Sequence, residues 1–416
     1  MQQYKTITNL FGIFIFAISA MAQESNEVQK TLFERDSLFI ASATEKVADN
    51  FGFSPSLSWI GEVWSNVSGG SKTSEVCDSL FTLGIEQDLS KLGKEDSNFG
   101  SLAMTAFWYT QSKRLEDWQG SHVCCVGHGA SNIFSSDMVR VFEIYYTNEF
   151  EIENSTVGFR IGQLASDEDF MGMDYADLFL NSNLGAIPAN ACVCLKNGSV
   201  AFSQYSLATF GATIYFSNDN FDAIVGIYNG DAGKDSVDNH GFNYNLHDIA
   251  VWYQLGVNYE VFGLDGRIQL GGNYHSGDFE NKYNGATVSD FYSFYLGIEQ
   301  DFVADNDGNA ILGGFVRIAY APKEEISECD KYIDCGLNWF GPIPSREGDI
   351  LGIAFATMKI NHIDYKFDNL LEITYRAQLT PAIAIQPTFQ AYLNAKDKNG
   401  ETNPAYVIGV RAEVNF

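Results

Sequence analysis

The stretch Ala405-Tyr-Val-Ile-Gly-Val-Arg-Ala-Glu-Val-Asn-Phe416 ends the chain, and its polarity alternates with a period of two residues. The even positions carry only apolar side chains and end on Phe416, whereas the odd positions from 407 onward include Arg411 and Glu413. Successive side chains of a β-strand point to opposite faces, so the stretch predicts a strand with one apolar and one polar face. Soluble β-sandwiches and transmembrane β-barrels both contain such strands. We favour a barrel, because it places the apolar face against lipid and the charged face against a water-filled lumen.

Residues 1–22 have the features of a secretory signal peptide. A charged start precedes an apolar run at 10–20, and Ala20-Met-Ala22 matches a small-x-small cleavage site. No later run approaches the roughly 18 to 20 apolar residues that a helical span needs. A closed barrel is then the structure that satisfies every backbone N–H and C=O in a membrane. We expect residues 23–55 to form a short, partly helical periplasmic segment and residues 56–416 to form the barrel.

The composition supports an exported membrane protein and excludes one class of partner. The chain has 32 Phe, 21 Tyr and 38 Gly, and 19% of its residues are charged, compared with about a quarter in soluble domains. Its formal net charge of -28 argues against nucleic acid, since phosphate binding needs clustered Lys and Arg. Acidic external loops would instead meet lipopolysaccharide through bridging divalent cations, in a chain surrounded by outer-membrane lipids.

Alternating segments continue through the chain and predict an all-β, transmembrane antiparallel β-barrel of 16 strands. The connections after the third, fifth and seventh segments are long (112–138, 166–205 and 230–248), whereas those after the fourth, sixth and eighth are short. Short periplasmic turns and long extracellular loops are typical of barrels in the outer membrane of Gram-negative-type cells. The predicted strands are 57–67, 78–89, 101–111, 139–150, 156–165, 206–217, 221–229, 249–261, 264–275, 291–303, 310–321, 331–341, 350–361, 367–379, 382–394 and 405–416.

Charged residues in the middle of these strands are predicted to face the lumen, because a charge on the lipid face costs roughly 2 to 4 kcal/mol. Two interpretations stay open. These residues either wet the pore and pair with one another, or they form a constriction that hydrogen-bonds a polar solute. Arg offers a fork of donors, carboxylates accept from hydroxyls, and aromatic faces pack on a sugar ring. The candidates for the constriction are Glu143, Arg160, Arg317, Glu372 and Arg376.

An ordered series of motifs resembles the OprB-type carbohydrate-selective porins. Phe159-Arg-Ile-Gly-Gln-Leu164 with Asp167-Glu-Asp-Phe170 resembles the family's R-x-G-Q-x-x-x-D-x-x-F segment, and Leu178-Phe-Leu-Asn-Ser182 resembles its F-x-N-S. Near the end, residues 371–381 and 385–387 are similar to the family's E-L-T-Y-x-x-x-x-T-P-W and L-Q-P-D. The resemblance covers about residues 52–416, and the ordered series is more specific than any single motif.

The resemblance implies a sixteen-stranded outer-membrane channel that admits small sugars by passive diffusion. Ala382 stands where the family usually has Trp, and Thr388 where it has Asp; these differences concern the solute more than the fold. The alternatives are a general or cation-preferring diffusion porin and a surface-binding barrel. Whether the channel is a monomer or a homo-oligomer stays open.

An enzyme is not expected. None of the six His lies in an H-E-x-x-H context, and no Ser lies in a G-x-S-x-G context beside a base. The cysteine spacings lack the His partners of a zinc site, so we expect neither a metal nor another cofactor. Phe416 is a terminal aromatic residue on an amphipathic strand, and we expect the outer-membrane assembly machinery to read it as a signal.

Seven cysteines lie in or near the predicted external loops, and export makes disulfides possible. We expect one bridge between Cys329 and Cys335. A second is expected between the two longest loops, joining Cys124 or Cys125 to Cys192 or Cys194. Bridges of this kind would hold the loops over the mouth of the barrel.

Overall fold

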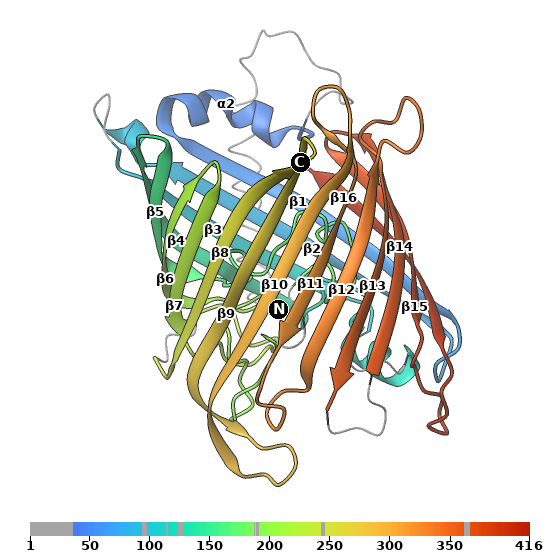
Figure 1. Ribbon diagram of the computed structural model, residues 1–416. Helices are drawn as coiled ribbons and strands as arrows, with labels where there is room; N and C mark the ends of the chain where they lie inside the picture. Colours follow the sequence, from blue (N-terminus) through green and yellow to red (C-terminus); the bar gives the residue numbers. More distant parts are fainter. Residues whose placement is uncertain are drawn as a thin grey trace, which may run out of the picture.

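The computed structural model describes residues 36–93, 98–113, 115–123, 128–186, 188, 191–242, 246–361 and 367–416. Sixteen strands form a closed barrel, in which every strand pairs antiparallel with its neighbours in the sequence and β1 pairs with β16 (Figure 1). The predicted fold class and strand number are therefore confirmed. None of the helices in the described part of the chain has the length and apolar character needed to cross a bilayer.

The strands follow the alternating segments closely, and in the described part of the chain four helical elements accompany them. The largest difference from prediction is at β9, which ends at residue 280 rather than 275, and β1, β2 and β10 each begin four residues earlier than predicted. The strands are β1 Phe53–Ser68, β2 Ser74–Asp88, β3 Ser101–Gln111, β4 Met138–Ile152, β5 Ser155–Leu164, β6 Thr209–Asn218, β7 Phe221–Asn229, β8 Ile249–Val261, β9 Leu264–Glu280, β10 Thr287–Ala304, β11 Ala310–Tyr320, β12 Cys329–Phe340, β13 Ile350–Ile360, β14 Phe367–Thr380, β15 Ile383–Tyr392 and β16 Ala405–Asn415. The helical elements are α2 Ile40–Phe51, η3 Ser90–Leu92, α3 Leu115–Trp118 and η4 Gln119–Val123.

The two faces of each strand separate as the alternation predicts. In β16, the side chains of Ile408 and Val410 are 48% and 47% exposed on the outside, whereas Arg411 is 6% exposed on the inside. In β14, Ile373 is 39% exposed and its neighbour Glu372 is fully buried. The outer surface is thus an apolar band suited to lipid, and the inner surface is polar.

The two ends of the barrel differ in their connections. At one end, which we call the short-turn end, two-residue turns join β4 to β5, β6 to β7 and β8 to β9. Phe262-Gly263, between β8 and β9, has φ values of 57° and 76°, which are the left-handed values that a tight type I′ hairpin requires. The opposite end, which we call the long-loop end, carries residues 112–137, 165–208 and 230–248. Helix α2 and the C-terminus lie at the short-turn end (Figure 1).

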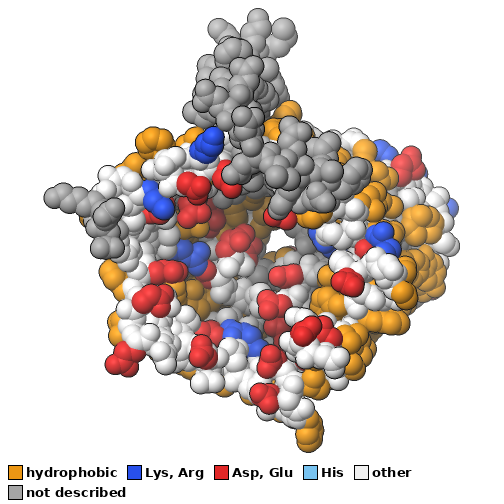
Figure 2. Space-filling view, turned by 90° about the horizontal axis from the view of Figure 1, so that it is seen from above, with side chains coloured by type: hydrophobic (Ala, Val, Ile, Leu, Met, Phe, Trp, Pro, Cys, Tyr) orange, Lys and Arg blue, Asp and Glu red, His pale blue; other side chains and the backbone are white. Residues whose placement is uncertain are grey.

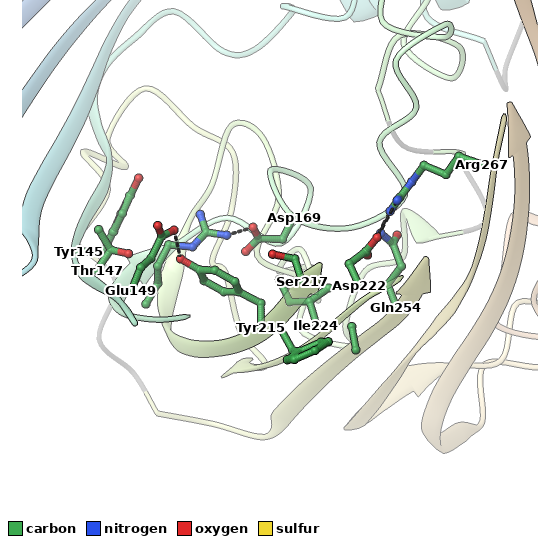
Figure 3. A pocket seen from close by; sticks show the side chains of 13 residues that line it. Tyr145, Thr147, Glu149, Asp169, Tyr215, Ser217, Asp222, Ile224, Gln254 and Arg267 are labelled. Carbon is green, nitrogen blue, oxygen red and sulfur yellow. Dashed lines mark hydrogen bonds and ion pairs between the residues drawn. The ribbon is translucent and has the colours of Figure 1, made fainter. Parts of the chain in front are cut away.

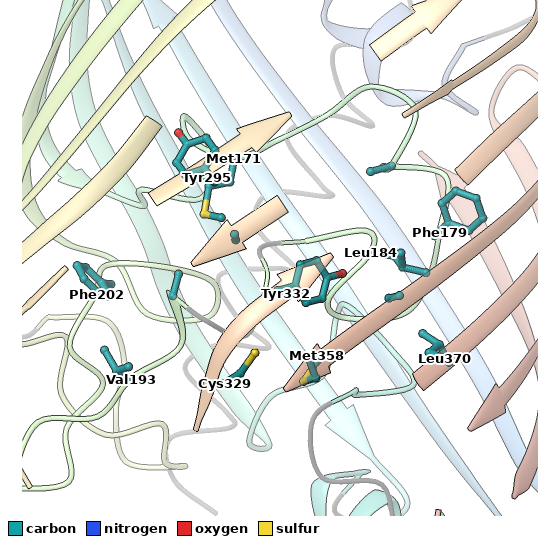
Figure 4. Close-up of a cluster of buried hydrophobic side chains, with 14 of the residues drawn as sticks. Met171, Phe179, Leu184, Val193, Phe202, Tyr295, Cys329, Tyr332, Met358 and Leu370 are labelled. Carbon is teal, nitrogen blue, oxygen red and sulfur yellow. The ribbon is translucent and has the colours of Figure 1, made fainter. Parts of the chain in front are cut away.

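Residues 165–208 are called the inserted loop below, and their described part folds back into the barrel. The prediction of an external loop is wrong for this segment. Its Phe170, Phe179 and Phe202 are fully buried, and the rings of Phe170 and Phe202 pack on Trp252 of the wall. Figure 4 shows Phe179 and Phe202 among the buried apolar side chains. Burying each of these rings contributes roughly 2 kcal/mol relative to leaving it in water. The lumen is therefore partly filled by a packed apolar core, as in a globular domain.

The two ends of the described chain meet at the seam between β1 and β16. Leu38 N donates to Asn415 O at 2.9 Å, and the rings of Phe39 and Phe416 lie 6.0 Å apart. Helix α2 then leads from this contact to β1. The helical character predicted for the segment before the barrel is present in α2, and the barrel begins at Phe53. The predicted signal peptide, residues 1–22, lies outside the described residues.

The predicted bridge between Cys329 and Cys335 is wrong. Both residues lie in β12 and both are free; Cys329 is buried, whereas Cys335 is exposed. Six residues of extended strand separate their Cα atoms by about 20 Å, whereas a disulfide needs about 7 Å or less. Cys192 is also free, so the part of the second prediction that uses it is wrong. Cys124 and Cys125 lie outside the described residues, so a bridge from one of them to Cys194 stays a prediction.

Candidate solute-binding site in the lumen

Side chains of the barrel wall hold the backbone of the inserted loop. Most are Gln or Glu residues on the polar inner face, and each gives the loop a donor or acceptor that the lumen water would otherwise supply. The contacts follow the loop in order: Glu143 Oε1 accepts from Ala165 N (2.8 Å), Gln254 Oε1 from Met171 N (3.2 Å), Gln269 Nε2 donates to Gly172 O (2.9 Å), Glu299 Oε1 accepts from Tyr175 N (2.7 Å) and Gln386 Nε2 donates to Leu178 O (2.7 Å).

Arg317 is the most heavily engaged of these wall residues. It is fully buried, and its guanidinium donates to the backbone oxygens of Met171, Asn183, Leu184 and Ala186 at 2.7 to 3.1 Å. It also pairs with the buried carboxylate of Asp334 at 2.7 Å. Its N–H groups are therefore directed at the loop and at Asp334 rather than at a passing solute.

Glu372 has a similar role on β14. Its two carboxylate oxygens accept from Leu180 N at 2.8 Å and Asn181 N at 3.0 Å, and the side chain is fully buried. Glu143, Arg317 and Glu372 all face the lumen as predicted. In this structure, however, their polar atoms anchor the inserted loop, which is an arrangement that neither sequence interpretation included.

The side chains of the other two predicted residues are partly exposed. Arg376 pairs with Glu413 at 2.8 Å on the neighbouring wall. Arg160 pairs with Asp169 of the inserted loop, and its guanidinium carbon lies 5.7 Å from the ring centre of Tyr145. Of the five candidates, only Arg160 lines the cavity described next.

This cavity has a volume of about 540 Å³ and lies between the inserted loop and the walls of β4 to β9 (Figure 3). Arg267 on β9 forms two parallel bonds with Asp222, at 2.6 and 3.0 Å, and Tyr215 donates to Glu149 at 2.6 Å. Arginine forks, carboxylates and tyrosine rings therefore surround one water-accessible space. The lining residues are Tyr145, Thr147, Glu149, Arg160, Asp169, Tyr215, Phe216, Ser217, Asp222, Ala223, Ile224, Gln254 and Arg267.

Sequence reasoning missed most of this lining. Asp169 belongs to a motif that had been noted, but its segment was assigned to an external loop. Glu149 and Asp222 lie near strand ends, where alternation is hard to tell from a polar turn. The sequence signal for insertion of the loop was its apolar character, because large side chains such as Phe170 and Phe179 are mostly buried in proteins and would be exposed in a segment that only projects into water.

Acidic side chains gather around the opening at the short-turn end (Figure 2). In the connection between β12 and β13 at this end, Arg346 hydrogen-bonds Asp349 and holds the pKa of that carboxyl below its usual value. In the described part of the chain, no group of three or more His, Cys, Asp or Glu is arranged to hold a metal ion. Exposed carboxylates at this end include Glu149, Glu151, Glu153, Asp219, Glu260, Asp265, Asp305 and Asp307.

Comparisons with known proteins agree with this architecture. The high-pH structure of Pseudomonas putida OprB superposes with a TM-score of 0.77 at 16% identity, covering 93% of this chain and 100% of that one. The low-pH structure of the same protein gives 0.57 at 16% identity, covering 92% and 99%. Among curated proteins, none matches the chain. The family model described as carbohydrate-selective porin, OprB family, matches residues 47–416, and the chain therefore belongs to that family.

Proposed function

We propose that this chain, a passive sugar-selective porin of the outer membrane, lets sugars through by way of the cavity beside the inserted loop. The observation that carries the proposal is the combination of arginine donors, carboxylate acceptors and tyrosine rings around that space. Every sugar hydroxyl both donates and accepts, so a site with both kinds of group suits it. Transport also requires weak binding, because the solute must leave again. We expect roughly millimolar affinity on this ground.

Block of ion current by glucose in planar lipid bilayers tests the proposal. Arg160→Ala removes a charged donor, and losing one hydrogen bond to a charged group costs about 1.5 kcal/mol, or roughly tenfold in affinity. Lys282→Ala is the matched control, because it removes a cation in an exposed pair with Glu328 outside the cavity. If the wild-type channel conducts ions but no sugar changes the current or swells loaded liposomes, the proposal is wrong.

A second candidate function is a channel that prefers cations. The acidic opening at the short-turn end favours it, because a mouth of one charge concentrates counter-ions. Reversal potentials in a salt gradient separate the candidates. A strong cation preference with no sugar block supports the second, whereas sugar block supports the first.

The topology also supports an orientation and a route to the membrane. We place the short-turn end in the periplasm and the long-loop end outside, where acidic loops meet lipopolysaccharide. Residues 1–22 direct export, and Phe416 serves as the assembly signal. A remaining disulfide joins Cys124 or Cys125 to Cys194, and non-reducing mass spectrometry that finds only free thiols would reject it.

A further inference from the structure

The charges that line the cavity do not balance. Arg160 pairs with Asp169, and Arg267 forms a two-bond pair with Asp222. The cavity has a third carboxylate, Glu149, so three acids stand against two arginines and leave a net charge of -1. Among the described residues Glu149 forms no ion pair, and its carboxylate accepts a hydrogen bond from Tyr215.

Glu149 also has the position that a binding group needs. It is exposed on the inner face of β4, and the cavity includes its side chain (Figure 3). Arg160 lies opposite Thr147 on the neighbouring strand, but its guanidinium is directed to Asp169. An anionic solute would have to displace a carboxylate from an arginine. A cationic solute would find a carboxylate that no arginine neutralises.

We propose that the cavity selects among sugars by charge, and that it prefers amino sugars, whose protonated amine Glu149 accepts, over neutral sugars and over sugar acids. This inference rests on the proposed sugar function. An ammonium group offers three donors and one positive charge, and the ring hydroxyls keep the partners that a neutral sugar uses. The two arginine pairs stay intact in this binding mode.

The test compares glucosamine, glucose and glucuronate as blockers of ion current, at a mildly acidic pH that keeps the amine protonated. We expect glucosamine to block roughly fivefold more strongly than glucose, which is about 1 kcal/mol and near the upper limit for a solvent-exposed ion pair. Glucuronate should block more weakly than glucose. The preference should shrink on going from about 0.1 M to about 1 M salt, because the Debye length falls from about 10 Å to about 3 Å.

Two variants separate the effect of the Glu149 charge from the electrostatic potential of the whole acidic opening at the short-turn end. Glu149→Gln keeps an acceptor for Tyr215 but removes the charge, and it should bring block by glucosamine to the level of block by glucose measured in the same variant. Asp307→Asn removes one exposed carboxylate from the short-turn end, away from the cavity lining. It should leave the preference as it is.

The possible outcomes distinguish the preference for amino sugars from the sugar-channel function. Equal block by glucosamine and glucose in the wild-type channel overturns the charge preference and leaves the sugar function standing. Equal losses of preference in the Glu149 and Asp307 variants also overturn it, since the mouth rather than the cavity would be responsible. If none of the three sugars blocks or permeates, the sugar function itself fails.

Discussion

Arg317→Ala should release the inserted loop and open the channel. Removing one partner of a buried ion pair costs about 3 to 5 kcal/mol, because Asp334 is left buried and charged. Three backbone oxygens of the loop, those of Met171, Leu184 and Ala186, also lose their donor, at about 1 kcal/mol each, whereas Asn183 O keeps its bond from the Tyr332 hydroxyl. The cost of keeping the loop in place then reaches about 6 to 8 kcal/mol. Burial of Phe170, Phe179 and Phe202 opposes release with roughly 6 kcal/mol in total.

Because these opposing terms are similar, we expect the variant to populate both the inserted and the released loop. Single channels should show a larger and noisier conductance, and limited proteolysis should cut within residues 165–208 while the barrel stays resistant. Arg376→Ala is the matched control: it removes the same charge from the lumen wall, but the partners it loses are Gln378 on its own strand and Glu413 on β16, not the inserted loop. That variant should keep the wild-type conductance noise.

A double variant tests the stranded charge separately. Arg317→Met with Asp334→Leu replaces the buried pair by apolar side chains, which removes the unpaired carboxylate and is often neutral for stability. It should recover much of the protease resistance that Arg317→Ala loses. If Arg317→Ala alone keeps both a protected loop and the wild-type conductance, the anchoring role of this residue is refuted.

Three further predictions concern other contacts. Deleting Phe416 should leave unfolded, protease-sensitive chain in the periplasm, and normal surface levels of the deletion variant would contradict the assembly role. Glu372→Ala leaves Leu180 N and Asn181 N without their acceptor, so it should loosen the loop by about 1 to 3 kcal/mol, seen as faster proteolysis; unchanged cleavage would argue against this anchor. The pKa of Asp349 is lowered by Arg346. The ionised carboxylate therefore contributes to the stability of the folded state above the pKa it has in the unfolded chain, and this contribution is lost as pH falls through its folded-state pKa. Asp349→Asn should therefore lower the urea midpoint in vesicles at neutral pH but not in strong acid, and a pH-independent difference would contradict the linkage.

The barrel was predictable because its main signal is local. β3, β7 and β8 have the bounds that alternation predicted, since each is a short segment with apolar and polar residues at a period of two. The ends of β9 and β10 at their shared loop were harder to predict. Residues 276–280 contain Ser, Gly and Asp and read as a loop, but cross-strand pairs such as Phe279 with Val288 continue the ladder beyond the predicted end.

The site was predictable only in part, because its assembly depends on contacts distant in sequence. Alternation correctly placed Arg317 and Glu372 on the inner face. The alternation contained no information on the path of the inserted loop. Because the loop passes over Arg317 and Glu372 but not fully over Arg160, the first two are covered and Arg160 lines the cavity. The Cys329–Cys335 pairing failed for a related reason, because proximity in sequence was taken for proximity in space within one extended strand.

The hydrogen bonds between the wall and the inserted loop involve largely main-chain atoms of the loop, as those of Ala165, Met171, Gly172 and Tyr175 illustrate. Main-chain atoms are the same whatever the side chain. Exposed side chains of the loop can therefore change in evolution without altering how the loop is held. In such a channel, side-chain atoms of the loop affect solute selectivity, whereas its main-chain atoms hold it in the barrel. A few substitutions can therefore change the preferred solute while the barrel still assembles.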